Sequence, residues 1–162
     1  MNNPHQLKVS KRAYQILLGC AVLGSLVACV SNRITHNERH ALTPDLVCPD
    51  ARQYRDRVVG DGHCVSLIKR CSGAPDTINW RPGATVLNAD LPAGTIIATF
   101  KGDRYPSRRG YHAAIYIEQD ERGIWVWDQW VGKPVHRRLI RIRQDGALPS
   151  NSAQAYRVVK LR

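Results

Sequence analysis

The chain has 162 residues, with 24 lysines and arginines against 13 aspartates and glutamates, so its formal net charge at pH 7 is +11. This length allows one domain with a substantial core and is too short for two, and a hydrophobic content of 43% without low-complexity tracts argues against a mainly disordered chain. A surface this basic suits nucleic acid, anionic lipid or anionic cell-wall polymers as partners.

The first 28 residues have the pattern of a bacterial export signal. Basic residues precede a run of thirteen apolar or small residues, "ILLGCAVLGSLVA", and Cys29 follows directly. The stretch "LVAC" that ends at Cys29 resembles a lipobox, in which the cysteine is diacylated and the chain is cut just before it. We therefore predict a lipoprotein-type signal at residues 1–28 and a lipid on Cys29 that anchors the protein in the bacterial periplasm, at the outer membrane.

Two alternatives remain open for this segment: a cleaved, soluble secretory protein and an uncleaved membrane anchor. A spanning helix needs roughly 20 apolar residues, and the stretch reaches that length only if polar neighbours are included. Residues 29–46 are polar and without a clear period, which is typical of a tether. The remaining domain, residues 47–162, would then lie in an oxidising compartment where disulfides persist.

Two helices are predicted at the start of this domain. A proline and an acidic residue suit a first helical turn, so "PDARQYRDRVV" predicts a short helix from Pro49 that a glycine-rich turn ends. Apolar residues at helical spacing predict a second helix from Cys64 to about Cys71, ended by Gly73. Residues 76–93 are rich in turn-forming residues and predict little regular structure.

The second half of the chain predicts strands. Runs of β-branched and aromatic residues alternate with short polar loops, and "QDERG" is typical of a hairpin turn. Five strands are expected, at residues 94–100, 112–118, 124–130, 136–143 and 155–161. Helices followed by an antiparallel sheet predict an α+β fold.

Cys64 is the candidate nucleophile. It stands directly after a glycine-rich turn and begins the second predicted helix, where the helix dipole and free N–H groups favour a thiolate and can bind an oxyanion. Gly60 and Gly62 allow tight backbone conformations and the close approach of a substrate. The alternative is a buried or disulfide-bonded cysteine.

The other two cysteines of the domain are candidates for a disulfide. Cys64 and Cys71 are separated by roughly 10 Å of helix rise, which is too far for a bridge, since disulfide Cα atoms lie within about 7 Å. Cys48 and Cys71 are therefore the expected pair, and this pair leaves Cys64 single. Two unpaired thiols at these positions remain the alternative.

A nucleophilic cysteine needs a base, and His112 is the best candidate. It opens a predicted strand, and the alanines that follow leave room for a helix, whereas His63 adjoins Cys64 and is expected at the rim. A tight hairpin puts residue 112 opposite residue 128 or 129, so Asp128 would lie on the same face and orient the ring. Gln129 is the alternative if the register slips by one residue.

Three motifs in this order resemble a known family. "GDGHCVSLIK", "LPAGTIIATF" and "HAAIYIEQDERGIWVWDQW" are similar to the cysteine helix, the preceding strand and the histidine hairpin of NlpC-type and CHAP-type cell-wall hydrolases. These are compact papain-like enzymes, and small amidase effectors of type VI secretion are near relatives. The resemblance implies Cys64 as nucleophile, His112 as base and Asp128 as third residue, and it relates Tyr54 to the tyrosine upstream of the cysteine.

The resemblance implies a cysteine hydrolase that cuts amide bonds in the peptide stem of peptidoglycan, with Gly62, His63, Tyr54 and Gln129 at the substrate site. An inhibitory or immunity protein is a further expected partner. The export signal departs from the effectors and favours a resident envelope enzyme. A non-catalytic peptidoglycan-binding lipoprotein and a thioester-forming acyltransferase remain alternatives.

No cofactor, metal or nucleic acid is expected. The sequence has no CxxC or HExxH spacing of the kind that binds zinc. The export signal and the lack of a recognised nucleic-acid module argue against DNA or RNA as partners.

Overall fold

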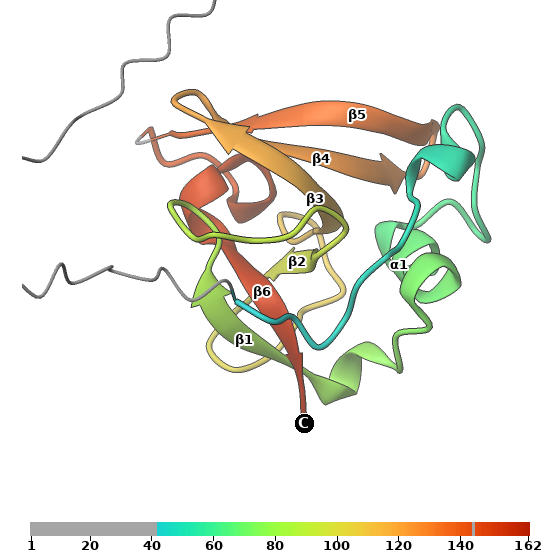
Figure 1. Ribbon diagram of the computed structural model, residues 1–162, viewed down its shortest axis with the longest axis horizontal. Helices are drawn as coiled ribbons and strands as arrows, with labels where there is room; N and C mark the ends of the chain where they lie inside the picture. The colour runs from blue at the N-terminus through green and yellow to red at the C-terminus, as the bar shows by residue number, and fades with distance from the viewer. Residues whose placement is uncertain (1–41, 144) are drawn as a thin grey trace, which may run out of the picture. The chain divides into compact units, whose positions relative to one another are not determined.

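The computed structural model describes residues 42–143 and 145–162 (Figure 1). The predicted signal, Cys29 and most of the tether lie outside the described residues. No helix within the described ranges is long and apolar enough to cross a membrane. The elements are η1 (Arg52–Tyr54), α1 (Cys64–Ser72), η2 (Thr77–Asn79), β1 (Trp80–Thr85), β2 (Ile96–Thr99), β3 (Ala113–Asp120), β4 (Gly123–Trp130), β5 (Lys133–Arg141), η3 (Pro149–Asn151), η4 (Ala153–Ala155) and β6 (Tyr156–Leu161).

The strands form one antiparallel sheet in the order β1-β6-β2-β3-β4-β5. Strands β2 to β5 follow one another as neighbours, and β6 returns to lie between β1 and β2 (Figure 1). The predicted α+β class is confirmed, with six strands where five were expected. The helix α1 packs against β3 and β4.

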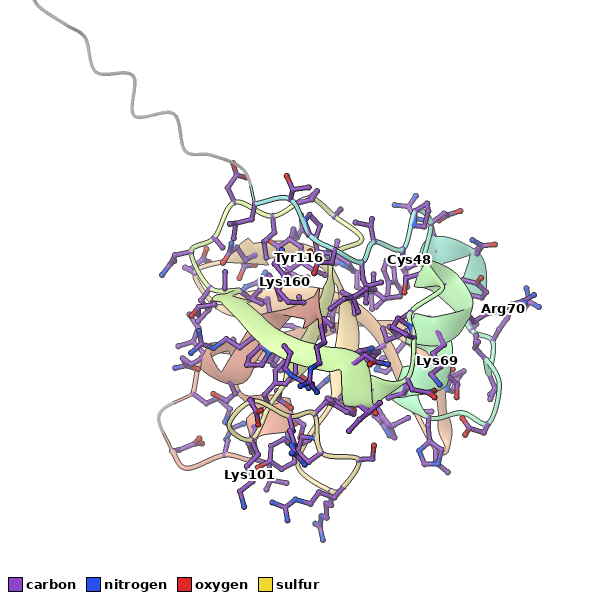
Figure 2. All side chains as sticks on the ribbon, turned by 90° about the horizontal axis from the view of Figure 1, so that it is seen from below. Cys48, Lys69, Arg70, Lys101, Tyr116 and Lys160 are labelled. Atoms are coloured by element: carbon purple, nitrogen blue, oxygen red, sulfur yellow. A yellow bond between two sulfur atoms is a disulfide. The ribbon has the colours of Figure 1, made fainter. Side chains whose placement is uncertain are left out.

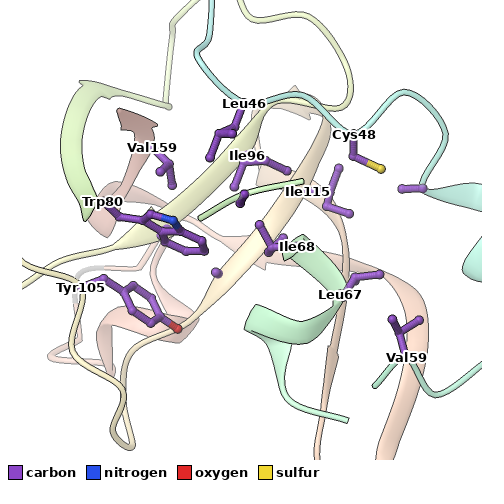
Figure 3. Close-up of a cluster of buried hydrophobic side chains, with 14 of the residues drawn as sticks. Leu46, Cys48, Val59, Leu67, Ile68, Trp80, Ile96, Tyr105, Ile115 and Val159 are labelled. Carbon is purple, nitrogen blue, oxygen red and sulfur yellow. The ribbon is translucent and has the colours of Figure 1, made fainter. Parts of the chain in front are cut away.

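Both faces of the sheet carry a hydrophobic core, because successive buried side chains along a strand belong alternately to two clusters. In β2, Ile96 and Ala98 join the cluster beneath α1, whereas Ile97 joins the cluster on the opposite face. Figure 3 shows the first cluster, in which Ile68 of α1 lies near Trp80 and Ile96. Since full burial of a large aliphatic side chain contributes about 1.5–3 kcal/mol, this double core fixes the sheet that carries the site.

The predicted helix at Cys64 is confirmed, and its sequence explains its placement. Leu67 and Ile68 are completely buried, whereas Lys69 and Arg70 lie on the exposed side of α1 (Figure 2). Gly73 ends the helix with a left-handed φ of 69°, a conformation that glycine adopts without steric cost.

The predicted helix from Pro49 is wrong, because only the single turn η1 forms. Asp56 adopts a left-handed φ of 62°, which interrupts the helical path. The backbone groups of this segment bond to β5 instead: Asp56 N–H donates to the Val135 carbonyl at 2.8 Å and Val135 N–H donates to the Arg57 carbonyl at 3.0 Å. The tertiary pairing therefore replaces the local helix.

Residues 76–93 contain the strand β1, which the sequence did not predict. Pro82 and Gly83 disfavour strands in general, but β1 lies at the edge of the sheet, where a missing N–H is tolerated. A Cβ at Gly83 would lie 2.9 Å from the Val158 carbonyl oxygen, so the glycine permits the close approach to β6.

Cys48 and Cys71 form a disulfide that joins the start of the domain to the C-terminal half of α1. Cys48 lies beside α1 in Figure 2. Cys64 is the unpaired cysteine of the described residues.

We expect the Cys48→Ser/Cys71→Ser double variant to lose about 3 kcal/mol of unfolding free energy, because the bridge closes a loop over a sequence separation of 23 residues. Urea denaturation of the variant and of the wild type with and without dithiothreitol measures this. Equal denaturation midpoints for the oxidised wild type and the variant would contradict the prediction.

Candidate active site

The chain presents Cys64 at the first turn of α1. Gly60 and Gly62 have positive φ values of 60° and 81°, and a Cβ at Gly60 would lie 2.9 Å from the Ser66 Cβ. The carboxylate of Asp61 accepts hydrogen bonds from the His63 N–H and the Ser66 hydroxyl, which ties the turn to the helix. The N–H groups of Cys64 and Val65 have no carbonyl acceptor in the helix and remain available as donors, whereas the Ser66 N–H donates to the His63 carbonyl at 3.1 Å.

Gln129 holds the same turn from the sheet side. This buried amide of β4 accepts a hydrogen bond from the Val59 N–H at 2.9 Å and donates to the carbonyls of Val59 and His63 at 2.8 and 2.9 Å. All of its polar atoms are therefore occupied by the backbone before Cys64. In this geometry Gln129 fixes the turn that precedes Cys64, and it does not line the cleft.

Three groups surround the sulfur of Cys64. The Tyr105 hydroxyl lies 3.4 Å from Sγ, and His112 and the Ala113 N–H lie close enough to lower the pKa of the thiol. Burial raises the pKa of the thiol, but the hydrogen bond and charge of His112, followed by the bonds from Tyr105 and Ala113, lower it further than burial raises it. The pKa of Cys64 is therefore below its usual value, which favours a thiolate.

His112 lies between Cys64 and Asp128. Its Nε2 is 3.0 Å from Asp128 Oδ2, so this nitrogen donates to the carboxylate and Nδ1 remains for the thiol. Burial lowers the pKa of His112, whereas the hydrogen bonds with Asp128 and Cys64 raise it, and the balance is a pKa of about 9. The geometry therefore favours an imidazolium beside a thiolate.

The predicted register of this hairpin is wrong. The sequence analysis put residue 112 opposite residue 128 or 129, whereas Ile115 pairs with Trp127, and continuing this ladder puts residue 114 opposite Asp128. A shift of two residues preserves the face, since side chains alternate with a period of two. Residue 112 and Asp128 are consequently diagonal neighbours, and they meet although they are not directly opposed. The one-residue slip to Gln129 does not occur.

Asp128 is completely buried and carries a second cation. The Nε of Arg138 in β5 donates to Oδ2 at 2.8 Å, and the Nη2 of the same side chain lies 2.7 Å from this oxygen in an ion pair. Burial raises the pKa of Asp128, but the His112 hydrogen bond and the Arg138 charge lower it below its usual value. The carboxylate therefore stays ionised, as the orienting partner of an imidazolium requires.

Cys64 and His112 open into a cleft of about 820 Å³, a volume that suits a small peptide. His63 lies at its rim, as expected. The Trp130 ring packs edge-on against His112, with ring centroids 6.4 Å apart. Tyr54 lines a separate hollow of about 440 Å³ together with Gly60, and Gly62 is buried under the turn, so neither reaches the cleft.

The sequence analysis missed Tyr105, the tyrosine that does contact the sulfur. It lies in the loop between β2 and β3, 41 residues after Cys64 and without any periodic signal. Burial, followed by the charge of Cys64, raises the pKa of Tyr105 far above its usual range, so the hydroxyl stays a donor. Within residues 42–143 and 145–162, no group of histidine, cysteine and acidic side chains has an arrangement that could hold a metal ion.

Comparison with known proteins gives one consistent family. The family model described as Domesticated amidase effector 2 matches residues 38–159. This chain belongs to that family. The "Type VI secretion amidase effector 2 protein" of Salmonella typhi is 42% identical over 117 residues, which cover 63% of this chain and 88% of that protein.

A relative and a solved structure agree with the family. The "Domesticated amidase effector 2" of Ixodes scapularis is 35% identical over 128 residues, covering 73% of this chain and 87% of that protein. The structure of a "Type 6 secretion amidase effector 2" has a TM-score of 0.63 at 38% identity and covers 72% of this chain and 94% of its own. The predicted neighbourhood of type VI amidase effectors and the predicted class of amide hydrolase are confirmed at the level of the family.

We expect Tyr105→Phe to shift the pH dependence of Cys64 alkylation to higher pH, because the hydroxyl lowers the pKa of the thiol. The ring keeps its packing on Trp80, with centroids 5.4 Å apart, so the fold is retained. Iodoacetamide labelling, read on the Cys64 peptide by mass spectrometry, measures the shift. Tyr116→Phe is the matched control at a buried tyrosine outside the cleft, and the idea is wrong if both variants give the wild-type curve.

Proposed function

We propose that the protein hydrolyses an amide bond in the peptide stem of peptidoglycan, with Cys64 as nucleophile, His112 as acid and base, and Asp128 as the residue that orients His112. One observation carries the proposal. Cys64 at the N-terminus of α1 and His112, which lowers the pKa of the thiol, line one open cleft, and the Nε2 of His112 lies 3.0 Å from the buried carboxylate of Asp128.

The first half of the reaction forms a thioester. The Cys64 thiolate attacks the amide carbonyl, and the oxygen that becomes negative faces the N–H groups at the start of α1 and the Tyr105 hydroxyl. The carbon–nitrogen bond then breaks, and His112 gives the proton on Nδ1 to the leaving amine. Asp128 stabilises the imidazolium and keeps Nε2 protonated throughout.

The second half of the reaction regenerates the enzyme. Neutral His112 removes a proton from water, the resulting hydroxide attacks the thioester carbonyl, and the carbon–sulfur bond breaks. The peptide leaves as a carboxylic acid, and Cys64 returns to the thiolate paired with the imidazolium. Water rather than a second amine completes the cycle, which distinguishes this proposal from an acyltransferase.

The choice of substrate rests on the relatives, which are named amidase effectors of type VI secretion. We propose further that residues 1–28 direct export and that a lipid on Cys29 holds the enzyme in the envelope, where peptidoglycan lies. The disulfide between Cys48 and Cys71 supports export, because such bridges persist in oxidising compartments. An inhibitory protein that protects the producing cell would be the corresponding partner.

We expect the purified full chain to release new peptide fragments from purified muropeptides, and the fragment masses name the bond that is cut. Cys64→Ala abolishes the fragments, and His112→Ala slows their release by about 10²–10⁴-fold, the usual contribution of an acid–base group. His63 is the neighbouring histidine at the rim of the cleft, and we expect His63→Ala to release the same fragments as the wild type. No cleavage by a wild-type chain whose Cys64 is also inert to iodoacetamide would leave a binding protein instead.

We expect a bell-shaped dependence of kcat/KM on pH, because the reaction needs the thiolate and the imidazolium together. Activity rises through the lowered pKa of Cys64 and falls as His112 loses its proton near pH 9. Asp128→Asn moves the alkaline limb to lower pH, since the Asp128 hydrogen bond is the largest of the interactions that raise the pKa of His112.

Asp76→Asn is the control for this profile, because Asp76 lines the same cleft but pairs with Lys69. Circular dichroism checks that both variants fold. An alkaline limb that stays in place in Asp128→Asn would remove Asp128 from the proposed mechanism.

A further inference from the structure

One lip of the cleft carries two arginines that the proposed mechanism does not use. Arg108 and Arg109 belong to the loop between β2 and β3, and both line the cleft that contains Cys64 and His112. The loop is held in place: Tyr111 N–H donates to the Arg108 carbonyl at 3.2 Å, and Ser150 N–H donates to the Gly110 carbonyl at 2.9 Å. The backbone that carries the two arginines is therefore held beside the cleft.

The aromatic ring of Tyr111 supports the first of these side chains. The guanidinium carbon of Arg108 lies 5.4 Å from the centroid of the Tyr111 ring, and Tyr111 itself lines the cleft. A guanidinium held over an aromatic face by a cation–π contact spends no N–H group on a conventional acceptor there, so its N–H groups remain available to a ligand.

The charge of this lip is not compensated within the described residues. Asp76 is the one acid along the cleft, and it pairs with Lys69, whereas Arg108 and Arg109 form no salt bridge there. The charges of the proposed catalytic groups balance one another, since the Cys64 thiolate faces the His112 imidazolium and the Asp128 carboxylate faces the Arg138 guanidinium. Three exposed apolar side chains, Ile78, Trp130 and Val131, also line the cleft. The uncompensated positive charge of the cleft therefore comes from Arg108 and Arg109.

We propose that Arg108 and Arg109 bind a carboxylate of the substrate next to the scissile amide, so that the enzyme prefers peptides in which this carboxylate is free to those in which it is amidated. The inference rests on the proposed function and deepens it. A guanidinium fork matches the two oxygens of a carboxylate, whereas a carboxamide has no charge and turns a donor toward the arginine.

The first test needs no peptidoglycan. Iodoacetate and iodoacetamide both alkylate the Cys64 thiolate, forming a carbon–sulfur bond and releasing iodide, and they differ only in a carboxylate or an amide. We expect the ratio of the iodoacetate to the iodoacetamide rate constant to fall about fivefold in Arg108→Gln/Arg109→Gln, the effect of an exposed ion pair of ~1 kcal/mol. The single variants give intermediate ratios.

Arg104→Gln is the charge-matched control. It removes a cation from the same loop, but its side chain is 75% exposed, pairs with Asp103 and does not line the cleft. We expect it to keep the wild-type ratio. A ratio that is equal in the wild type, the double variant and Arg104→Gln overturns the inference, and thermal unfolding confirms that the variants compared are folded.

The second test uses two synthetic stem peptides that differ only in whether the carboxylate beside the scissile amide is free or amidated. We expect wild-type kcat/KM to be about fivefold higher for the free form, and the double variant to lose this preference, so that its kcat/KM values for the two peptides become equal. Equal kcat/KM for both peptides overturns the inference and leaves the amidase intact. If neither peptide nor muropeptide is cut, the proposed function fails, and the alkylation ratio still decides whether the arginines select a carboxylate.

Discussion

The carboxylate of Asp128 is completely buried, and a buried charge is stable only where opposite charges and hydrogen-bond donors surround it. His112 from the start of β3 and Arg138 from β5 supply both, and all three of their close contacts go to Oδ2. Oδ1 has no hydrogen-bond partner within the described residues, although His136 Nε2 lies 3.8 Å away. The orientation of the carboxylate, and with it the ring of His112, therefore depends on Arg138. Loss of either His112 or Arg138 would remove one of the two positive charges that stabilise the buried carboxylate of Asp128.

The residue after Asp128 acts on the opposite face of the sheet. Consecutive side chains of a strand point to opposite faces, so Asp128 reaches His112 and Arg138, while Gln129 reaches the turn that precedes α1. One short stretch of β4 thus positions His112 and Cys64, the proposed base and nucleophile, at the same time. This stretch is buried on both sides of the sheet, and a displacement of β4 relative to the other strands would move both residues.

The sequence predicted the parts of the site that depend on local patterns. The helix at Cys64 has a clear amphipathic period. The alternation of side chains along β3 and β4 put residue 112 and Asp128 on one face although the predicted register was wrong, because residues two apart in a strand point to the same face. Tyr105 could not be predicted, since a loop residue meets Cys64 only through the tertiary fold. Arg138 looks like one of several basic residues in an alternating strand. Likewise β1 was missed, because Pro82 and Gly83 are unfavourable unless the strand lies at an edge.

The helix that carries Cys64 is held at its two ends by different chemistry. At its C-terminal half the disulfide from Cys71 to Cys48 fixes it to the segment that opens the domain, and at its N-terminus three hydrogen bonds from Gln129 fix the turn. The disulfide persists in an oxidising compartment, whereas the hydrogen bonds of the Gln129 side chain form in any compartment. With the bridge formed, Cys64 is the remaining thiol of the described residues, and it lies seven residues from Cys71, too far along the helix to exchange with it directly. Formation of this disulfide would therefore stabilise the helix and leave Cys64 reduced.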